Sequence, residues 1–256
     1  MKIACWAALV ISLWLVLVLS TLPASWAVYI AQNTLPNWQV SAVNGNFLQG
    51  KVHNNQLVID NKPFPLGELK WQLNPITFLW LTPCVKFTTH LRNQVLSANV
   101  CLSLIDGQLH LYNGRFSINA TALEPWLAVR LEGSADMTMK SMSFKKGSVS
   151  DVEGVIKWRK AQFHNSRTWV DLGNLEIRLS DNGAGDMQGK LTNIGPGPLT
   201  ADLTIEISST SGLSISGEVT PNVKEQSTSN EAFHQTLQII GKPNKRGGYV
   251  IAWSNL

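Results

Sequence analysis

In Leu203-Thr204-Ile205-Glu206-Ile207, every second side chain is apolar and the two residues between are polar. The same alternation recurs at residues 109–112, 175–179 and 213–216. Period-two alternation is the pattern of a β-strand that buries one face and exposes the other. The sequence therefore predicts a mainly β fold, a twisted antiparallel β-rich domain.

Turn signals separate these stretches: Asn44-Gly45, Asp106-Gly107, Asn113-Gly114 and Asn182-Gly183. Such pairs connect neighbouring antiparallel strands. Helical patterns are short. Residues 74–81 have Asn74 as a cap and Pro75 in the first turn, and residues 230–240 carry apolar side chains at helical spacing before Gly241. We expect one or two short helices beside the sheet.

An approximate internal repeat has a period near 100 residues. Residues 66–73 (Leu-Gly-Glu-Leu-Lys-Trp-Gln-Leu) are echoed by residues 172–179 (Leu-Gly-Asn-Leu-Glu-Ile-Arg-Leu). Chance matching in a chain rich in Gly and Leu is the alternative explanation. The repeat predicts two related β-units, residues 37–132 and 148–256, divided near residues 133–147.

The amino terminus has a different character. Residues 3–22 follow Lys2 and carry no charge, and about 20 residues of helix span the roughly 30 Å of a bilayer core. We expect a transmembrane anchor at residues 3–22, with residues 1–2 as a cytoplasmic stub, because positive residues stay in the cytoplasm. A cleaved signal peptide with its site at Ser25-Trp26-Ala27 is the alternative. Both hypotheses export the body from about residue 30 to residue 256.

Two cysteines lie in the body, Cys84 and Cys101. If the chain reverses at Arg92-Asn93 through a two-residue loop, they stand directly opposite each other, in the closer, non-hydrogen-bonded kind of pair. A bridge between them closes a loop of about 17 residues and adds about 3 kcal/mol. Two buried free thiols are the alternative, and an oxidising compartment favours the disulfide.

Composition and motifs argue against several classes of function. The net charge of +4 comes from 21 basic and 17 acidic residues without a basic block, so no nucleic-acid partner is expected. The five histidines lack metal-ligand spacing, and residues 183–190 lack the Ser or Thr of a phosphate loop. Asp151 and Glu153 lie two residues apart, on one face of a strand, as a metal or acid/base site requires, but nearby Lys157 and Arg159 favour a solvated charged face. We predict no enzyme, and no catalytic, cofactor-binding or metal-binding residues.

Four blocks of sequence resemble the type II secretion system protein N family. Residues 43–50 are similar to its Gly-x-x-Trp-x-Gly turn, with Phe47 or Leu48 in place of the Trp, and residues 66–75 to its Leu-Gly-x-Val-x-Trp-x-Leu-x-Pro segment. The third block joins residues 170–175 to 191–199. The last joins residues 217–221 to 237–249 and its closing Leu-Gly-x-Pro element. These blocks follow the family order across nearly the whole chain.

The resemblance implies a single-span inner-membrane protein of a Gram-negative bacterium with its bulk in the periplasm. It implies an accessory part of the machine that exports folded proteins across the outer membrane, with no known active site. The expected partners are other secretion-system subunits, bound through sheet faces or by strand addition at sheet edges, and the lipid bilayer through residues 3–22.

Two other functions compete with this one. A periplasmic lipid-handling protein has a sheet that curls into an apolar trough for acyl chains, with phospholipid as its partner. A secreted β-sandwich hydrolase has lost its signal peptide. Alternation does not separate a trough from a sandwich, because both place every second side chain inward.

Overall fold

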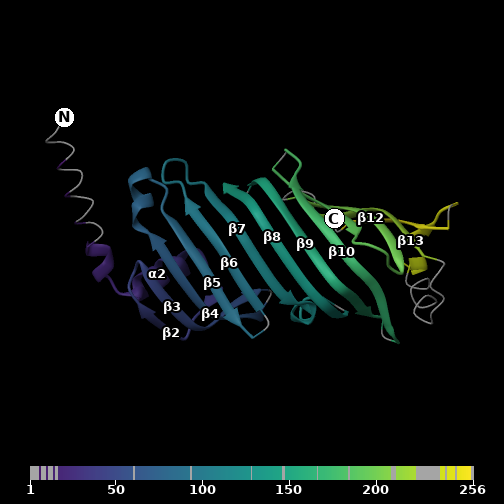
Figure 1. Ribbon diagram of the computed structural model, residues 1–256, viewed down its shortest axis with the longest axis horizontal. Helices are drawn as coiled ribbons and strands as arrows, with labels where there is room; N and C mark the ends of the chain where they lie inside the picture. The colour runs from purple at the N-terminus through teal and green to yellow at the C-terminus, as the bar shows by residue number, and fades with distance from the viewer. Residues whose placement is uncertain are drawn as a thin grey trace. The chain divides into compact units, whose positions relative to one another are not determined.

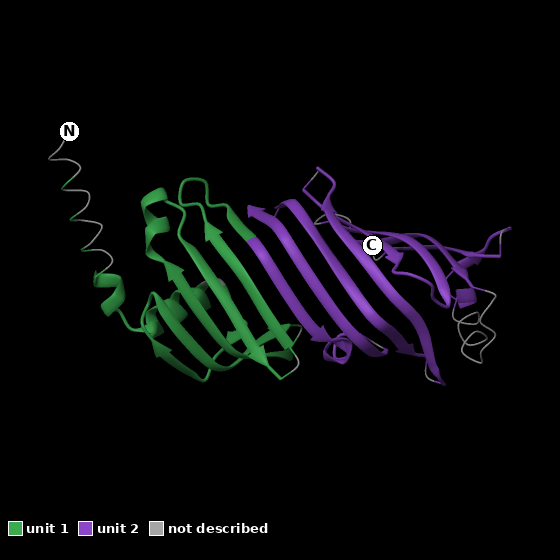
Figure 2. Ribbon diagram, in the orientation of Figure 1, with its two compact units in different colours: residues 1–111 green, residues 112–256 purple. Residues whose placement is uncertain are grey.

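A computed structural model of the chain describes residues 6, 10, 14, 17–59, 61–92, 94–127, 129–145, 148–165, 167–183, 185–208, 212–222, 237–239, 241–245 and 247–254. These residues form antiparallel strands with a few short helices (Figure 1). The predicted mainly β antiparallel fold is therefore confirmed. The chain divides into two compact units, residues 1–111 (unit 1) and residues 112–256 (unit 2) (Figure 2).

Unit 1 combines one helix with a sheet. Its strands are hydrogen-bonded in the order β1-β3-β4-β5-β6, and β2 pairs with β3. The elements are α2 (Ala24–Thr34), β1 (Trp38–Gln39), β2 (Ala42–Gly45), β3 (Gln49–Ile59), β4 (Lys62–Asn74), the 3₁₀-helix η1 (Pro75–Trp80), β5 (Cys84–Leu91) and β6 (Gln94–Leu102). Strand β7 (Leu109–Asn119) contains the boundary between the units.

Unit 2 is a longer antiparallel sheet in the order β8-β9-β10-β11-β12-β13-β15-β14. Its elements are the 3₁₀-helix η2 (Ala120–Leu123), β8 (Arg130–Lys145), β9 (Ser148–His164), β10 (Trp169–Asp181), β11 (Met187–Asn193), β12 (Leu199–Ser208), β13 (Gly212–Pro221), β14 (Gly241–Pro243) and β15 (Tyr249–Ser254). Residues 133–145, which the repeat hypothesis places between two units, belong to strand β8.

Helix α2 covers one face of the unit 1 sheet and lies behind the strands in the view of Figure 1. Ala24 and Val28, one helical turn apart, pack with Trp38, Val52 and Trp71 in a buried apolar cluster. Because α2 occupies this face, residues of alternate parity on β3 and β4, such as Lys51 and Lys70, face away from the helix.

The core of unit 2 is made mainly by strand residues. Val170, Leu199, Ala201, Val219 and Ile251 are buried together with Tyr249 and Leu237. Residues 237–239 are helical, as predicted, and the rest of the predicted helix at residues 230–240 lies outside the described residues.

The predicted short helix at residues 74–81 is present as η1. Asn74 caps η1 by accepting a hydrogen bond from the Ile76 N–H, with Pro75 in the first turn. The turn predictions at Asn44-Gly45 and Asn113-Gly114 are wrong. The first pair belongs to β2, where it faces β3, and the second pair lies inside β7. Asn113 has a φ of 51°, so the Asn-Gly signal for left-handed backbone marks an irregularity within a strand. Helices α2 and η2 were not predicted.

The predicted anchor at residues 3–22 falls mostly outside the described residues. Of its described part, residues 17–21 are helical. Across the described ranges, no helix combines the length and the apolar character needed to cross a membrane. The anchor therefore stays a prediction.

The hairpins β3–β4 and β9–β10 have the same register, 106 residues apart. Val52 faces Leu69 as Trp158 faces Leu175, and Lys51 faces Lys70 as Lys157 faces Glu176. Each hairpin then shifts register at a glycine with positive φ, Gly67 at 74° and Gly173 at 76°. The third strands also correspond, because Gln72 faces Lys86 as Arg178 faces Lys190. These two three-stranded segments provide an internal comparison, while the full repeat of residues 37–132 and 148–256 stays a prediction.

Candidate functional site

The acidic and glycine-rich stretches singled out in the sequence make structural contacts among the described residues. No three His, Cys, Asp or Glu side chains gather there as metal ligands. Glu153 pairs with Lys140 at 2.7 Å, and the Asp151 carbonyl accepts a hydrogen bond from the Ser141 hydroxyl. In the glycine-rich stretch, the side chain of Asn182 accepts from the Asp186 N–H, which closes the β10–β11 turn.

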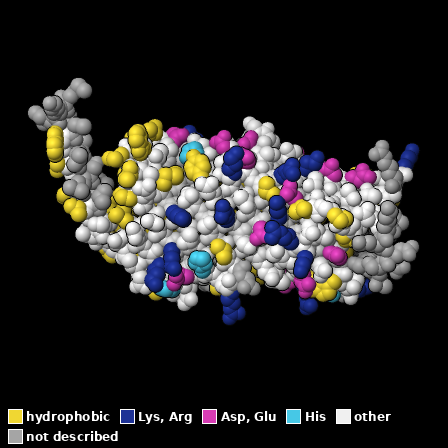
Figure 3. Space-filling model, in the orientation of Figure 1, with side chains coloured by type: hydrophobic (Ala, Val, Ile, Leu, Met, Phe, Trp, Pro, Cys, Tyr) yellow, Lys and Arg dark blue, Asp and Glu magenta, His cyan; other side chains and the backbone are white. Residues whose placement is uncertain are grey.

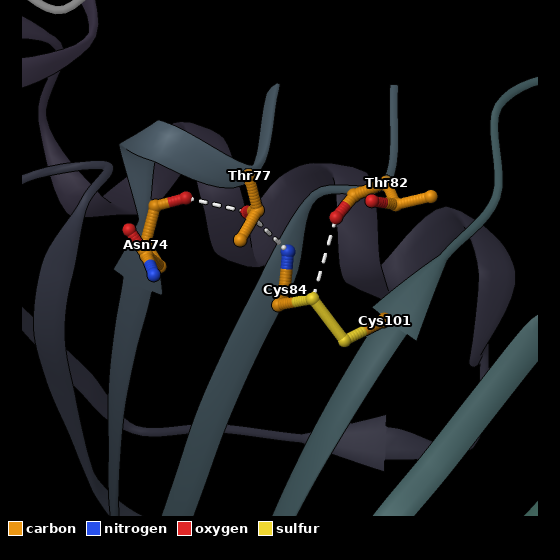
Figure 4. Close-up of a disulfide and its surroundings, with 5 residues drawn as sticks. All are labelled: Asn74, Thr77, Thr82, Cys84 and Cys101. Carbon is orange, nitrogen blue, oxygen red and sulfur yellow. Dashed lines mark hydrogen bonds between the residues drawn. A yellow bond between two sulfur atoms is a disulfide. The ribbon is translucent and has the colours of Figure 1, made fainter. Parts of the chain in front are cut away.

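The structure contains a disulfide between Cys84 and Cys101, with an S–S distance of 2.07 Å (Figure 4). The two residues are register partners on β5 and β6, and their Cα atoms lie 4.0 Å apart. Leu91 pairs with Gln94 at the other end of the hairpin, so the register is the one that a reversal between them predicts. The bridge fixes the end of the hairpin that adjoins η1.

Hydrogen bonds join η1 to this end of the hairpin. The Thr77 hydroxyl donates to the Asn74 carbonyl at 2.6 Å and accepts from the Cys84 N–H at 2.9 Å (Figure 4). The Leu81 carbonyl accepts from the Leu104 N–H at 2.9 Å, which ties the β6–β7 connection to the end of η1. The disulfide and these bonds together hold two connecting segments side by side.

These two segments present exposed apolar side chains, which we call the η1 patch: Ile76, Leu79, Trp80, Leu81, Leu102, Leu104 and Ile105. Trp80 is 75% exposed and Ile105 is 78% exposed. Hydrophobic side chains gather visibly at the end of unit 1 that carries η1 (Figure 3). A group of large exposed apolar residues on a braced segment is typical of a contact surface.

A second feature of unit 1 is an apolar pocket of about 180 Å³ between α2 and the sheet. Its lining includes Ala27 and Ala31 of α2 and Leu69, Val85 and Phe87 of the strands. The two indole N–H groups nearby have partners, since Trp38 donates to the Asn55 side chain at 3.0 Å and Trp71 donates to the Phe47 carbonyl at 3.1 Å. Because the polar atoms are satisfied, the pocket suits an apolar group.

The face of unit 1 that points away from α2 carries a groove of about 540 Å³, lined by Lys51, Lys70 and Lys86 among other residues. The Lys70 ammonium lies 3.0 Å from Glu68, which also lies 3.1 Å from the His53 ring. The hydrogen bond from Lys70, aided by the charges of Lys70 and Lys51, holds the pKa of the Glu68 carboxyl below its ordinary value, and desolvation acts in the opposite direction.

Sequence reasoning found the disulfide and missed the other three features. The sequence does contain a signal for the η1 patch. Residues 71–85, which begin at the end of a strand, contain no charged side chain. The pocket depends on α2, which was not predicted. The groove lined by Lys51, Lys70 and Lys86 depends on which residues of three strands face each other, and a single sequence does not give that register.

Comparison with known proteins adds a family to this geometry. The family model described as Type II secretion system (T2SS), protein N matches residues 36–252. No curated protein and no solved structure matches the chain.

Proposed function

The chain belongs to the type II secretion system protein N family, and from that premise we propose that it is an accessory subunit of the secretion apparatus that acts through protein–protein contacts. The family match supports a component of this system and contacts with its other subunits. We further propose that its role is accessory, that it binds through a defined contact surface and that it is anchored in the membrane.

We assign the contact surface to the η1 patch. It combines Trp80 and Ile105, both mostly exposed, on segments fixed by the Cys84–Cys101 disulfide. A surface held in place before binding loses little conformational entropy on association, and exposed aromatic anchors dominate many interfaces. Strand addition is less favoured at β1 and β14, because they have only two and three residues and β14 contains Pro243.

The proposal places residues 3–22 in the inner membrane and the β-domain in the periplasm. Its support is the uncharged run after Lys2, together with a disulfide of the kind that persists in oxidising compartments. Confinement to the membrane raises the local concentration of other subunits, so a small patch is sufficient for binding.

Site-specific crosslinking in intact cells tests this function. A photoreactive amino acid at Trp80 or Ile105 is expected to capture a secretion-system subunit, and the same probe at the exposed Lys140 of unit 2 is the matched control. The double variant Leu79→Ser/Trp80→Ser should reduce release of folded exoproteins at unchanged protein level. Equal capture from Lys140, or full release by the double variant, would count against the η1 patch.

A second candidate function is periplasmic lipid handling, which the apolar pocket between α2 and the sheet favours. At about 180 Å³, the pocket takes part of an acyl chain and not a whole lipid. The variant Ala31→Phe fills the pocket from α2. Phospholipid that copurifies with the native chain and is lost from this variant would favour lipid handling. An unchanged lipid content in the variant would argue against lipid handling in this pocket.

A further inference from the structure

The two equivalent hairpins differ in charge at the same register position. In unit 2, Lys157 faces Glu176 and their charged groups lie 3.8 Å apart. In unit 1, the equivalent residues are Lys51 and Lys70, two like charges directly opposite each other. Like charges at directly opposed positions destabilise a sheet, so the unit 1 arrangement costs stability that the unit 2 arrangement avoids.

The third strand shows the same contrast. Lys190 of unit 2 pairs with Asp202 at 3.4 Å. Its equivalent in unit 1, Lys86, has no ion pair with any described residue, and neither has Lys51. Glu68 is therefore the single carboxylate, within the described part of unit 1, that pairs with any of these three lysines, and it pairs with Lys70.

The three lysines share a concave surface. Lys51, Lys70 and Thr88 are register neighbours across β3, β4 and β5, and Gln49, Gln72 and Lys86 form the next row on the same face. All six residues line the groove of about 540 Å³. Basic side chains stand on the face of unit 1 shown in Figure 3. The groove thus offers ammonium, amide and hydroxyl donors to one ligand.

We propose that this groove, which we call the lysine groove, binds a phosphate ester. Its cations are lysines, which bind phosphate as point charges, whereas planar carboxylates are best matched by the fork of an arginine. At about 540 Å³, the groove has room for a phosphate together with the organic group that it esterifies. The same chemistry is present in a free phosphate monoester and in the headgroup of an anionic phospholipid. The assignment is independent of the secretion role.

The test uses the full chain in a neutral detergent, with binding measured by calorimetry. One arm titrates glycerol 3-phosphate, and the other titrates dihexanoyl phosphatidylglycerol, with dihexanoyl phosphatidylcholine as the uncharged comparison. Binding in both arms assigns the site to the phosphate group itself. Binding of the phosphatidylglycerol alone assigns it to a lipid headgroup. Absence of binding in both arms overturns the proposal.

Matched variants distinguish binding in the lysine groove from general electrostatic attraction between an anion and the lysines of the chain. Lys51→Gln and Lys86→Gln should each weaken binding roughly fivefold, and the pair more than tenfold. The unit 2 equivalents Lys157→Gln and Lys190→Gln should leave it unchanged. Glu68→Gln should tighten binding, because it frees the Lys70 ammonium. An equal loss in the unit 2 variants, or binding of poly-glutamate with neither phosphate probe, overturns the assignment.

Folding does not confound these variants. Removing Lys51 relieves its repulsion with Lys70, and neither Lys51 nor Lys86 has an ion pair with a described residue, so the unfolding transition should be unchanged or raised. Lys157 and Lys190 take part in solvent-exposed pairs that contribute little. Unfolding curves recorded in the same detergent establish this for each variant.

Discussion

At the scale of single residues, Asn55 is the polar side chain on which the unit 1 core depends. It is 1% exposed, accepts a hydrogen bond from the Trp38 indole and donates to the Gly67 carbonyl at 3.0 Å. It therefore joins the apolar cluster beneath α2 to the register shift between β3 and β4. Nothing in the sequence around Asn55 distinguishes it from Asn54, which is exposed, so its role follows from the fold alone.

The variant Asn55→Ala should lower the free energy of unfolding by about 2–3 kcal/mol, because it leaves a buried indole N–H and a carbonyl without partners. Gln56→Ala is the control. It removes an exposed hydrogen bond to Gln39 and should cost less than about 0.5 kcal/mol. Denaturant unfolding measures both values, and equal losses would show that the buried network contributes nothing specific.

The lowered pKa of Glu68 leads to a prediction about pH dependence. The hydrogen bond from Lys70 is the largest cause of its lowered pKa, so Lys70→Gln should raise the pKa of Glu68 toward the ordinary value. A carboxyl whose pKa is lowered by folding stabilises the folded state above its ordinary pKa, and that contribution disappears as the pH falls through the lowered value. The carboxyl carbon shift of Glu68, followed by NMR against pH, checks the direction. Lys140→Gln is the control and should leave this titration unchanged.

At the scale of elements, the Cys84–Cys101 bridge fixes β5 to β6 over a sequence separation of 17 residues. Loop-closure entropy for that length predicts a loss of about 3 kcal/mol in the paired variant Cys84→Ser/Cys101→Ser. A reducing agent should lower the stability of the native chain to the level of the variant and leave the variant unaffected. If reduction leaves the native chain as stable as before, the bridge has no such role.

The two equivalent register shifts provide a second prediction for the strands. A Cβ at Gly67 would collide with the His90 carbonyl, whereas at Gly173 the nearest atom, Cδ of Pro198, is 3.2 Å away. Both glycines have positive φ, so Ala costs about 1 kcal/mol of backbone strain at either position. Gly67→Ala should therefore destabilise the chain by more than Gly173→Ala, as measured by their unfolding midpoints. Equal losses or the reverse order would show that the tighter surroundings of Gly67 do not decide the cost.

The elements also show what a sequence predicts and what it leaves open. Period-two alternation predicted the strands, and counting back from Arg92 predicted that Cys84 faces Cys101, because a short hairpin fixes its own register. Asn113-Gly114 was wrongly predicted to be a turn, because left-handed backbone occurs at irregular positions within strands as well as in turns. The lysine groove was beyond prediction because Lys51, Lys70 and Lys86 come from three strands, and their charges become neighbours only once the register is known.

At the scale of the whole molecule, the secretion role and the lysine groove make separate demands. The role requires an exported domain held near other subunits, and the groove requires only a folded unit 1. Loss of phosphate binding in the Lys51→Gln/Lys86→Gln variant with normal exoprotein release would therefore separate the two. Conversely, loss of exoprotein release in the η1 patch variant with normal phosphate binding would also show that the two functions are independent.

The membrane placement leads to the last prediction. Lys2 and the uncharged residues 3–22 should orient the chain with its carboxyl terminus outside the cytoplasm. Alkaline phosphatase, which needs disulfides, should therefore be active when fused after Leu256, and β-galactosidase fused at the same point should be inactive. Alkaline carbonate extraction then distinguishes the two fates of the segment, because an anchor keeps the fusion in the membrane pellet and a cleaved signal releases it. The reverse pattern of enzyme activities would place the domain in the cytoplasm, where a stable Cys84–Cys101 bridge and contacts with periplasmic subunits are both disfavoured.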